Sequence, residues 1–178
     1  NLKKINSKIL KKKIINVLEN LQLNFENEND RERFFLIINY FQSIGHINKS
    51  YELIERYELN DDKNINIYTE IKLNYLLSTF QLNEACIFKD ELNLDIKLAY
   101  SFLEKLDIFC LILNNNYSEA SLLNSILIES EANQDVYFQD LFSFLSNSSD
   151  EININNQIEI NKELIFLYSA MIRIAEVP

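Results

Sequence analysis

Residues 34–54 read FFLIINYFQSIGHINKSYELI, two largely apolar stretches on either side of a glycine. Apolar residues at intervals of three and four are typical of a helix with one buried face. Gly45 is the only glycine in the 178-residue chain. Glycine adopts the positive φ that ends a helix without a steric penalty, so it permits a tight turn here. The stretch therefore predicts a helix, a turn and a second helix.

The same pattern recurs twice more at an interval of 35 residues, without a gap. Six apolar positions and one small position keep their character in all three copies: Leu36, Ile71 and Leu106; Ile38, Leu73 and Ile108; Phe41, Leu76 and Leu111; Ile47, Leu82 and Tyr117; Leu53, Phe88 and Leu123; Tyr57, Leu92 and Leu127; Ser50, Ala85 and Ala120. A fixed period of this length is typical of proteins whose units bury their apolar faces against their neighbours. We expect an all-α fold, an α-solenoid of antiparallel helix pairs with about eight or nine helices.

The periodic pattern places the expected helices and divides the chain into three regions. The helices are expected at residues 2–23, 30–44, 47–59, 65–80, 82–92, 95–114, 116–131, 134–147 and 163–175, with Asp30 as an N-cap. Residues 147–161 are polar, with isolated isoleucines, and we expect a long loop that has some tendency to form a short strand. The regions are a lysine-rich helix in 1–24, three repeats in 30–131, and a degenerate capping repeat in 132–178.

Charge is distributed unevenly along the chain. Residues 1–24 contain six lysines and one glutamate, a net +5, and the remaining residues carry −15, which gives the total of −10. Leu10, Ile14, Val17 and Leu21 form one apolar stripe in the first helix, and several lysines lie on another face. We expect this helix to dock on the acidic body or on a second copy. A membrane-surface arm and a nucleic-acid arm are the alternatives.

The composition argues against most catalytic and metal sites. One glycine does not support a Rossmann or P-loop phosphate site, and His46, the only histidine, has no evident nucleophile or orienting partner. One histidine and two separate cysteines do not make a four-ligand zinc site. The acidic pairs lie in expected loops or on solvent faces: Asp61 with Asp62, Asp90 with Glu91, and Asp150 with Glu151. We expect no catalytic residue, no metal and no cofactor, and we interpret the chain as a non-enzymatic protein.

The cysteines and the hydropathy pattern bear on the compartment. Cys86 and Cys110 have apolar neighbours in expected helices, and we interpret them as buried free thiols in a reducing, cytoplasmic environment. No apolar stretch approaches the length of about 20 residues that spans a bilayer. The chain begins at Asn1 rather than at methionine, so a signal peptide upstream remains compatible with the sequence.

The stretch around Gly45 resembles a tetratricopeptide-type helix-turn-helix repeat. Gly45 stands at the turn, Ile47 packs under it, and small Ser50 lets the second helix approach the first. The segments LNEA at 82–85 and YSEA at 117–120 match the same part of the pattern, and the resemblance covers residues 30–131. Three features depart from it: Phe80 and Asn115 replace the turn glycine, Lys72 and Asp107 occupy apolar positions, and no unit ends in proline. The resemblance is therefore to the superfamily, and it implies a module that binds a protein or peptide.

First helices line the concave side of such stacks, so we examine their recurring residues as partner contacts. Asn39 and Asn74 lie one period apart, and with Lys72 they are the residues that we expect to contact a partner. Tyr40 and Tyr75 also recur, and we interpret them as packing residues. The acidic repeats favour a partner with a basic segment.

Three other functions are compatible with the sequence. The 35-residue spacing also resembles pentatricopeptide proteins, which bind single-stranded RNA one base per repeat, although their binding face is basic. An acidic inhibitor that mimics nucleic acid is the second alternative, and an enzyme with an unrecognised site is the third. An acidic repeat body disfavours contact with nucleic acid, because phosphate contacts supply most of the non-specific affinity.

Overall fold

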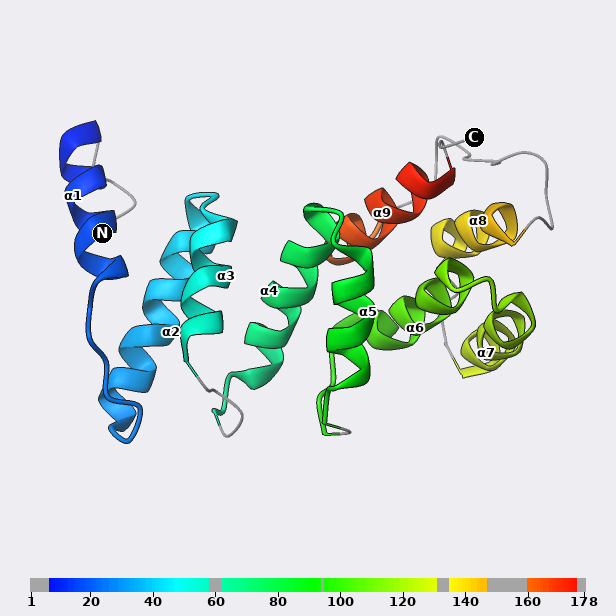
Figure 1. Cartoon of the computed structure of the whole chain (residues 1–178), viewed down its shortest axis with the longest axis horizontal. Helices are drawn as coiled ribbons and strands as arrows, with labels where there is room; N and C mark the ends of the chain where they lie inside the picture. The colour runs from blue at the N-terminus through cyan, green and yellow to red at the C-terminus, as the bar shows by residue number, and fades with distance from the viewer. Residues whose placement is uncertain (1–6, 58–61, 94, 131–134, 147–159, 176–178) are drawn as a thin grey trace. The chain divides into compact units, whose positions relative to one another are not determined.

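The computed structural model describes residues 7–57, 62–93, 95–130, 135–146 and 160–175. These residues form an all-α fold, and none of them is in a β-strand. Nine α-helices lie in the described ranges (Figure 1): α1 (Lys8–Glu19), α2 (Glu28–Ser43), α3 (Ile47–Arg56), α4 (Ile65–Ser78), α5 (Leu82–Asp90), α6 (Phe102–Leu113), α7 (Tyr117–Ser130), α8 (Val136–Leu145) and α9 (Ile165–Ala175). Within the described residues, no helix is both long and apolar enough to cross a membrane.

The chain divides into two compact units, Asn1–Tyr75 and Leu76–Pro178. The division falls inside α4, within the segment 30–131. Most of the expected loop at 147–161, including its possible strand, lies outside the described residues, and so do residues 1–6 of the expected first helix.

Two expected helix starts are wrong. The helix expected from residue 95 begins at Phe102, because Tyr100 and Ser101 adopt left-handed backbone angles, with φ of 58° and 50°. The N-cap of α2 is Asn27 rather than Asp30, and the Asn27 side chain accepts a hydrogen bond from the Asn29 backbone N–H. Asp30 lies in the first turn of α2, where its carboxylate accepts a hydrogen bond from the Asn24 backbone N–H. The Asx-type bond of Asn27 therefore starts the helix one turn earlier than expected.

The same helix-ending turn occurs three times, 35 residues apart. In each turn, one residue just after the end of the helix has positive φ: Gly45 (78°), Phe80 (61°) and Asn115 (59°). The next backbone N–H bonds to a carbonyl five residues earlier: His46 to Phe41 at 2.9 Å, Gln81 to Leu76 at 2.9 Å, and Asn116 to Leu111 at 2.8 Å. This is the Schellman pattern, in which a left-handed residue directs two N–H groups to otherwise unsatisfied carbonyls. A phenylalanine and an asparagine thus adopt the conformation that glycine adopts in the first turn.

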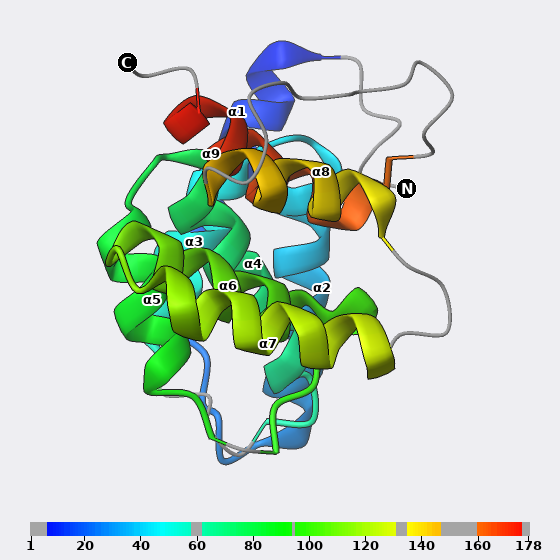
Figure 2. The same cartoon turned by 90° about the vertical axis from the view of Figure 1, so that its right-hand side faces the viewer.

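A small residue follows each of these turns and is fully buried. Ser50, Ala85 and Ala120 all have no exposed surface. In the first unit, the Ser50 hydroxyl lies 3.5 Å from the Ile38 carbonyl of α2, so the small side chain permits close approach of α3 to α2. The packing of α2 with α3, and of α6 with α7, produces antiparallel hairpins (Figures 1 and 2).

Contacts between the second helix of one pair and the first helix of the next pair also recur at an interval of 35 residues. In the first unit, the rings of Tyr51 in α3 and Tyr75 in α4 stack with centroids 4.0 Å apart. In the second unit, Cys86 in α5 and Cys110 in α6, each 35 residues later, form a disulfide with Cα atoms 5.7 Å apart. The expectation of free thiols is therefore wrong. The physical reason is that α5 and α6 pack against each other and bring these two positions together.

The core of the first unit is rich in aromatic side chains. Phe34, Phe41 and Tyr68 have almost no exposed surface, and Phe34 contacts Tyr68 edge to face at 5.6 Å between centroids. Burial raises the pKa of the Tyr68 hydroxyl, and the nearby Asp62 carboxylate raises it further. Three α1 residues, Ile14, Ile15 and Leu18, pack against this core from the side.

The second unit has a continuous core and long-range contacts. The helix α6 packs against α5, α7 and α8, and α8 packs against α9. Seven side chains from these elements are almost completely buried: Phe102, Leu106, Phe109, Phe138, Leu141, Leu167 and Met171. The Arg173 guanidinium of α9 lies 3.8 Å from the centroid of the Phe80 ring, so the last helix covers the turn that precedes α5.

Candidate partner-binding groove

An apolar groove lies between α1 and α2 in the first unit, with a volume of about 460 Å³. Six side chains line it: Leu18, Leu21, Arg33, Leu36, Ile37 and Tyr40. Leu36 is 65% exposed, the greatest exposure of any large apolar side chain of α2. An open groove with an exposed leucine and one cation at its edge is the kind of surface that accepts an apolar side chain or helix from a partner.

The end of α1 is held on α3 by polar contacts. The Glu19 carboxylate forms an ion pair with Lys49, and the Arg56 side chain donates a hydrogen bond of 2.9 Å to the Glu19 carbonyl oxygen. These contacts fix the side of the groove that contains Leu18 and Leu21.

The apolar stripe expected for the first helix is only partly correct. Ile14 and Leu21 pack against the core as expected, but Leu10 and Val17 are 47% and 61% exposed. Ile15 and Leu18 contact the core in their place. The observed face is therefore rotated from the expected one, because the contacts with Lys49 and Arg56 of α3 orient the helix from its C-terminal end.

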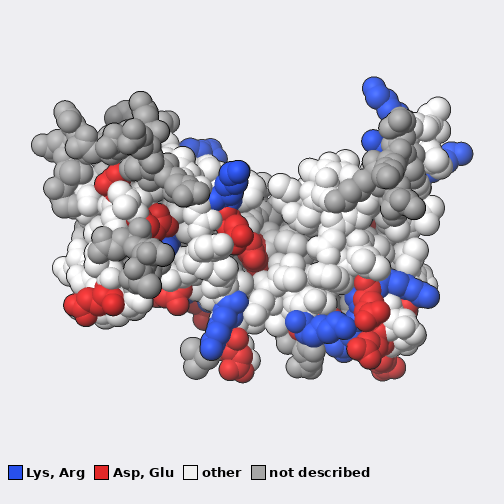
Figure 3. All heavy atoms as spheres, turned by 180° about the vertical axis from the view of Figure 1, so that it is seen from behind, with Lys and Arg blue, Asp and Glu red and all other residues white. Residues whose placement is uncertain are grey.

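The lysines of α1 are not part of the polar contacts that the structure describes in the first unit. Lys8, Lys11, Lys12 and Lys13 are exposed, and no ion pair joins them to any residue that the structure describes. The docking of α1 on the first unit therefore uses its apolar side chains and Glu19 rather than these lysines, and docking on a second copy stays a prediction. Seen from behind, basic side chains stand at the upper part of the α1 end of the chain, and acidic and basic side chains lie together below them (Figure 3).

The three expected contact residues have different environments. Asn39 is exposed on α2. The side-chain oxygen of Asn74 is buried and has no hydrogen-bond donor in the described part of the chain. Lys72 pairs with Glu55 of α3 at 2.5 Å. None of the three lines the groove, and their role as partner contacts stays a prediction.

Tyrosines that recur with these residues contribute to packing. Tyr40 is 7% exposed and belongs to the core, and it also lines the groove. Tyr75 stacks on Tyr51, as described above. The interpretation of both as packing residues agrees with these contacts.

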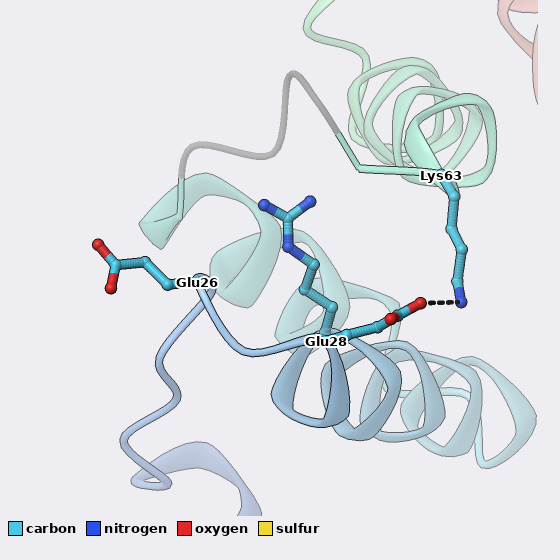
Figure 4. Close-up of a pocket in the computed structure, with 4 residues that line it drawn as sticks. Glu26, Glu28 and Lys63 are labelled. Atoms are coloured by element: carbon cyan, nitrogen blue, oxygen red, sulfur yellow. Dashed lines mark ion pairs between the residues drawn. The ribbon is translucent and has the colours of Figure 1, made fainter.

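A second, charged pocket of about 320 Å³ lies at the start of α2, and four residues line it: Glu26, Glu28, Arg31 and Lys63 (Figure 4). Lys63 pairs with Glu28 at 3.6 Å, and Arg31 donates a hydrogen bond of 2.6 Å from Nε to the Phe25 carbonyl oxygen. Two cations and two carboxylates nearly cancel, so this pocket has no strong preference for an ion of either sign.

Sequence reasoning missed a buried charged network in the second unit. Lys105 of α6 is 2% exposed and pairs with Asp135 at 3.1 Å. Its Nζ also donates to the Tyr100 carbonyl oxygen at 2.9 Å, and the Tyr168 hydroxyl donates to Asp135 at 2.6 Å. The signal was present in the sequence, because Lys105 lies three residues after Phe102 and four before Phe109, on the apolar face of its helix.

The remaining polar groups form no cluster that could hold a metal ion in the described residues. His46 lies at the start of α3, with its ring 6.5 Å from that of Phe41. No group of three or more histidine, cysteine or acidic side chains is placed to hold a metal ion there. Among the acidic pairs, Asp61, Asp150 and Glu151 lie outside the described residues.

Comparison with known proteins gives no relative: no protein-family model, curated protein or solved structure matches the chain.

Proposed function

We propose that the chain is a tetratricopeptide-like helical-repeat module that binds a protein or peptide without catalysing a reaction. The observation that carries the proposal is the Schellman turn at Gly45, Phe80 and Asn115, with the same hydrogen bonds at an interval of 35 residues. A turn that recurs with a buried small residue after it is expected when each unit packs on the next in the same way. The α-solenoid arrangement is part of this proposal.

The contacts between successive helix pairs also support the proposal. The Tyr51 and Tyr75 pair corresponds to the Cys86 and Cys110 pair, one period later. Lys72 pairs with Glu55, and Asp107, one period after Lys72, pairs with Lys89, which is adjacent to the position one period after Glu55. The tyrosine and cysteine pairs show that equivalent positions meet although their chemistry has changed, as in a degenerate repeat.

Charge suggests which partner segments each unit favours. The first unit has 12 basic and 11 acidic residues, a net +1, and the second has 5 basic and 16 acidic residues, a net −11. A basic segment of a partner is therefore expected to bind the second unit, where complementary charge accelerates association.

Affinity capture with the full chain tests the proposal. We expect a defined protein to co-purify after nuclease treatment, and the complex to weaken as salt increases. Gel shifts with a random single-stranded oligonucleotide test the RNA alternative. The variant Lys3→Gln, Lys4→Gln, Lys8→Gln, Lys11→Gln, Lys12→Gln, Lys13→Gln removes all six lysines of the basic arm while it retains the α1 side chains that pack on the core. Micromolar binding of RNA by this variant at about 150 mM salt would contradict the proposal, since phosphate contacts are then made by the body.

A further inference from the structure

The strongest unassigned feature is an apolar position that is covered in two helices and open in the third. Leu36, Ile71 and Leu106 are equivalent at the 35-residue period. Ile71 is 9% exposed and Leu106 is fully buried, whereas Leu36 is 65% exposed. Leu36 of α2 therefore lacks the neighbouring element that covers the equivalent apolar residues of α4 and α6.

The contacts of α4 within the first unit show what kind of neighbour this is. The residues of α4 that correspond to the groove residues of α2 contact the preceding helix pair: Tyr68 contacts Phe34 of α2, Lys72 pairs with Glu55 of α3, and Tyr75 stacks on Tyr51 of α3. Both helices of the preceding pair, α2 and α3, thus contact this face of α4. In front of α2, only α1 is present among the described residues, and it corresponds to a second helix, because Leu18 is one period before Leu53.

We infer that the groove between α1 and α2 is a docking site for an amphipathic α-helix with acidic flanks, supplied by a partner protein. The inference rests on the proposed function and names the class of partner for the first unit. The docked helix takes the place of a first helix and covers Leu36, Leu18 and Tyr40 with its apolar face. Recognition of an apolar helix face by an apolar groove is a recurring mode of peptide binding.

The charges around the groove select the acidic flanks. All four acidic residues of α1 and α2 are already paired with a cation: Glu19 with Lys49, Asp30 with Arg33, and both Glu28 and Glu32 with Lys63. The four lysines of α1 have no such partner in the described chain. Lys11 is two helical turns before Leu18, on the same face of α1, and Arg33 stands at the edge of the groove with 66% of its side chain exposed. The charge of α1 and α2 that no described acidic side chain pairs with is that of the α1 lysines and is positive, and Arg33, although paired with Asp30, adds an exposed cation at the groove.

The test measures fluorescence anisotropy with two fluorescein-labelled 18-residue helical peptides and the full chain. Both peptides have leucines in the same i, i+3, i+4, i+7 pattern, and one has glutamates and the other lysines beside that stripe. We expect the glutamate peptide to bind, and Leu36→Asp to weaken its binding at least tenfold. We expect Lys8→Glu combined with Lys11→Glu and Lys12→Glu to weaken binding of the glutamate peptide by a similar factor. We also expect added salt to weaken binding by this variant less than binding by the unmodified chain.

Matched controls separate the groove from other surfaces. Ile87→Asp changes an apolar residue of α5 that is 58% exposed in the second unit, and it should leave binding of the glutamate peptide unchanged. Leu36→Gln provides a second groove variant without added charge, and circular dichroism confirms that each variant is folded. The lysine peptide can associate with the acidic second unit, so only the part of its binding that Leu36→Asp removes reports on the groove.

Three results would overturn the inference: no binding of the glutamate peptide, equal binding by Leu36→Asp, or a greater Leu36-dependent affinity for the lysine peptide. A dimer in light scattering that Leu36→Asp dissociates would also overturn it, since a second copy would then occupy the groove. Failure of the proposed function is a separate result, because it appears as the absence of any captured protein, whichever peptide the groove prefers.

Discussion

The two units use the same turn but differ in what reinforces the helices around it. In the first unit, the turn residue is Gly45, the contact between pairs is a stack of two tyrosines, and a groove with exposed Leu36 remains open. In the second unit, the corresponding contact is the Cys86 and Cys110 disulfide, and Lys105 is buried with its counterion. A shared backbone period thus tolerates different chemistry at equivalent positions, and the more heavily reinforced unit is expected to unfold last.

Mutation of the buried Lys105 and Asp135 pair is expected to give the largest difference in stability between the two units. Asp135→Ala removes the carboxylate that pairs with the buried Lys105 charge, and this should reduce the free energy of unfolding of the second unit by about 3–5 kcal/mol. The matched change in the first unit, Glu55→Ala, breaks the more exposed pair with Lys72 and should cost less than ~1 kcal/mol. Hydrogen exchange with mass spectrometry measures each unit separately. Equal effects of the two variants would contradict the contrast between a buried and an exposed pair.

The disulfide should give the next largest difference. Cys86→Ser with Cys110→Ser opens a loop whose ends are 24 residues apart, and a loop of this size corresponds to roughly 3 kcal/mol of chain entropy. The loss should appear in urea unfolding and in exchange from α5 and α6, whereas peptides from α2 and α3 should not change. If the first unit lost as much protection as the second, the units would not be separate in stability.

Overpacking at the small position tests the shared register. Ala85→Leu adds carbon atoms at a fully buried position of α5, and the expected cost is about 1–3 kcal/mol. Ile87→Leu in the same helix, at an exposed position, should change stability by less than about 0.5 kcal/mol. A melting temperature of Ala85→Leu equal to that of the control would show that α5 has room at this position.

Substitutions at the turn residues should give the smallest changes in stability. Gly45→Ala puts a side chain at φ 78°, and a Cβ there meets no atom within 4 Å, so the cost is that of the backbone alone, about 1 kcal/mol. Asn115→Gly makes the opposite change at φ 59° and should stabilise by about 0.5 kcal/mol, because asparagine already tolerates this conformation better than most residues. Thermal unfolding of the two variants shows whether they shift in opposite directions. Shifts of the same sign would mean that the turns are not equivalent.

Local periodicity predicted the helices well, because apolar spacing and turn residues act within a few residues of each other. All nine expected helices overlap an observed α-helix, and the all-α class is confirmed. The start of α6 was wrong because Tyr100 and Ser101, two residues that rarely adopt positive φ, interrupt an otherwise helical pattern. The rotation of α1 was missed because it depends on Lys49 and Arg56, which lie in another helix.

The groove and the disulfide depend on contacts between helices, which the one-dimensional pattern does not contain. The period placed Leu36, Ile71 and Leu106 in one class, and only the burial of each shows that Leu36 differs. Cys86 and Cys110 belong to different helices of different expected repeats, and their distance follows from the packing of α5 on α6. Cys86 and Cys110 lie one period after Tyr51 and Tyr75, but the contact of the two tyrosines is itself seen only in the structure.

The contact of Arg173 with Phe80 affects the order in which the second unit can fold. The two residues are separated by most of the unit, so their meeting is a non-local event that the chain reaches only after a large loop has closed. Helix pairs that contact only their neighbours can form or melt one at a time from either end. Here Arg173 of α9 contacts Phe80 in the first turn of the unit, so unfolding of α9 also exposes Phe80. The second unit is therefore expected to fold with a slower, more cooperative final step than a simple array of hairpins.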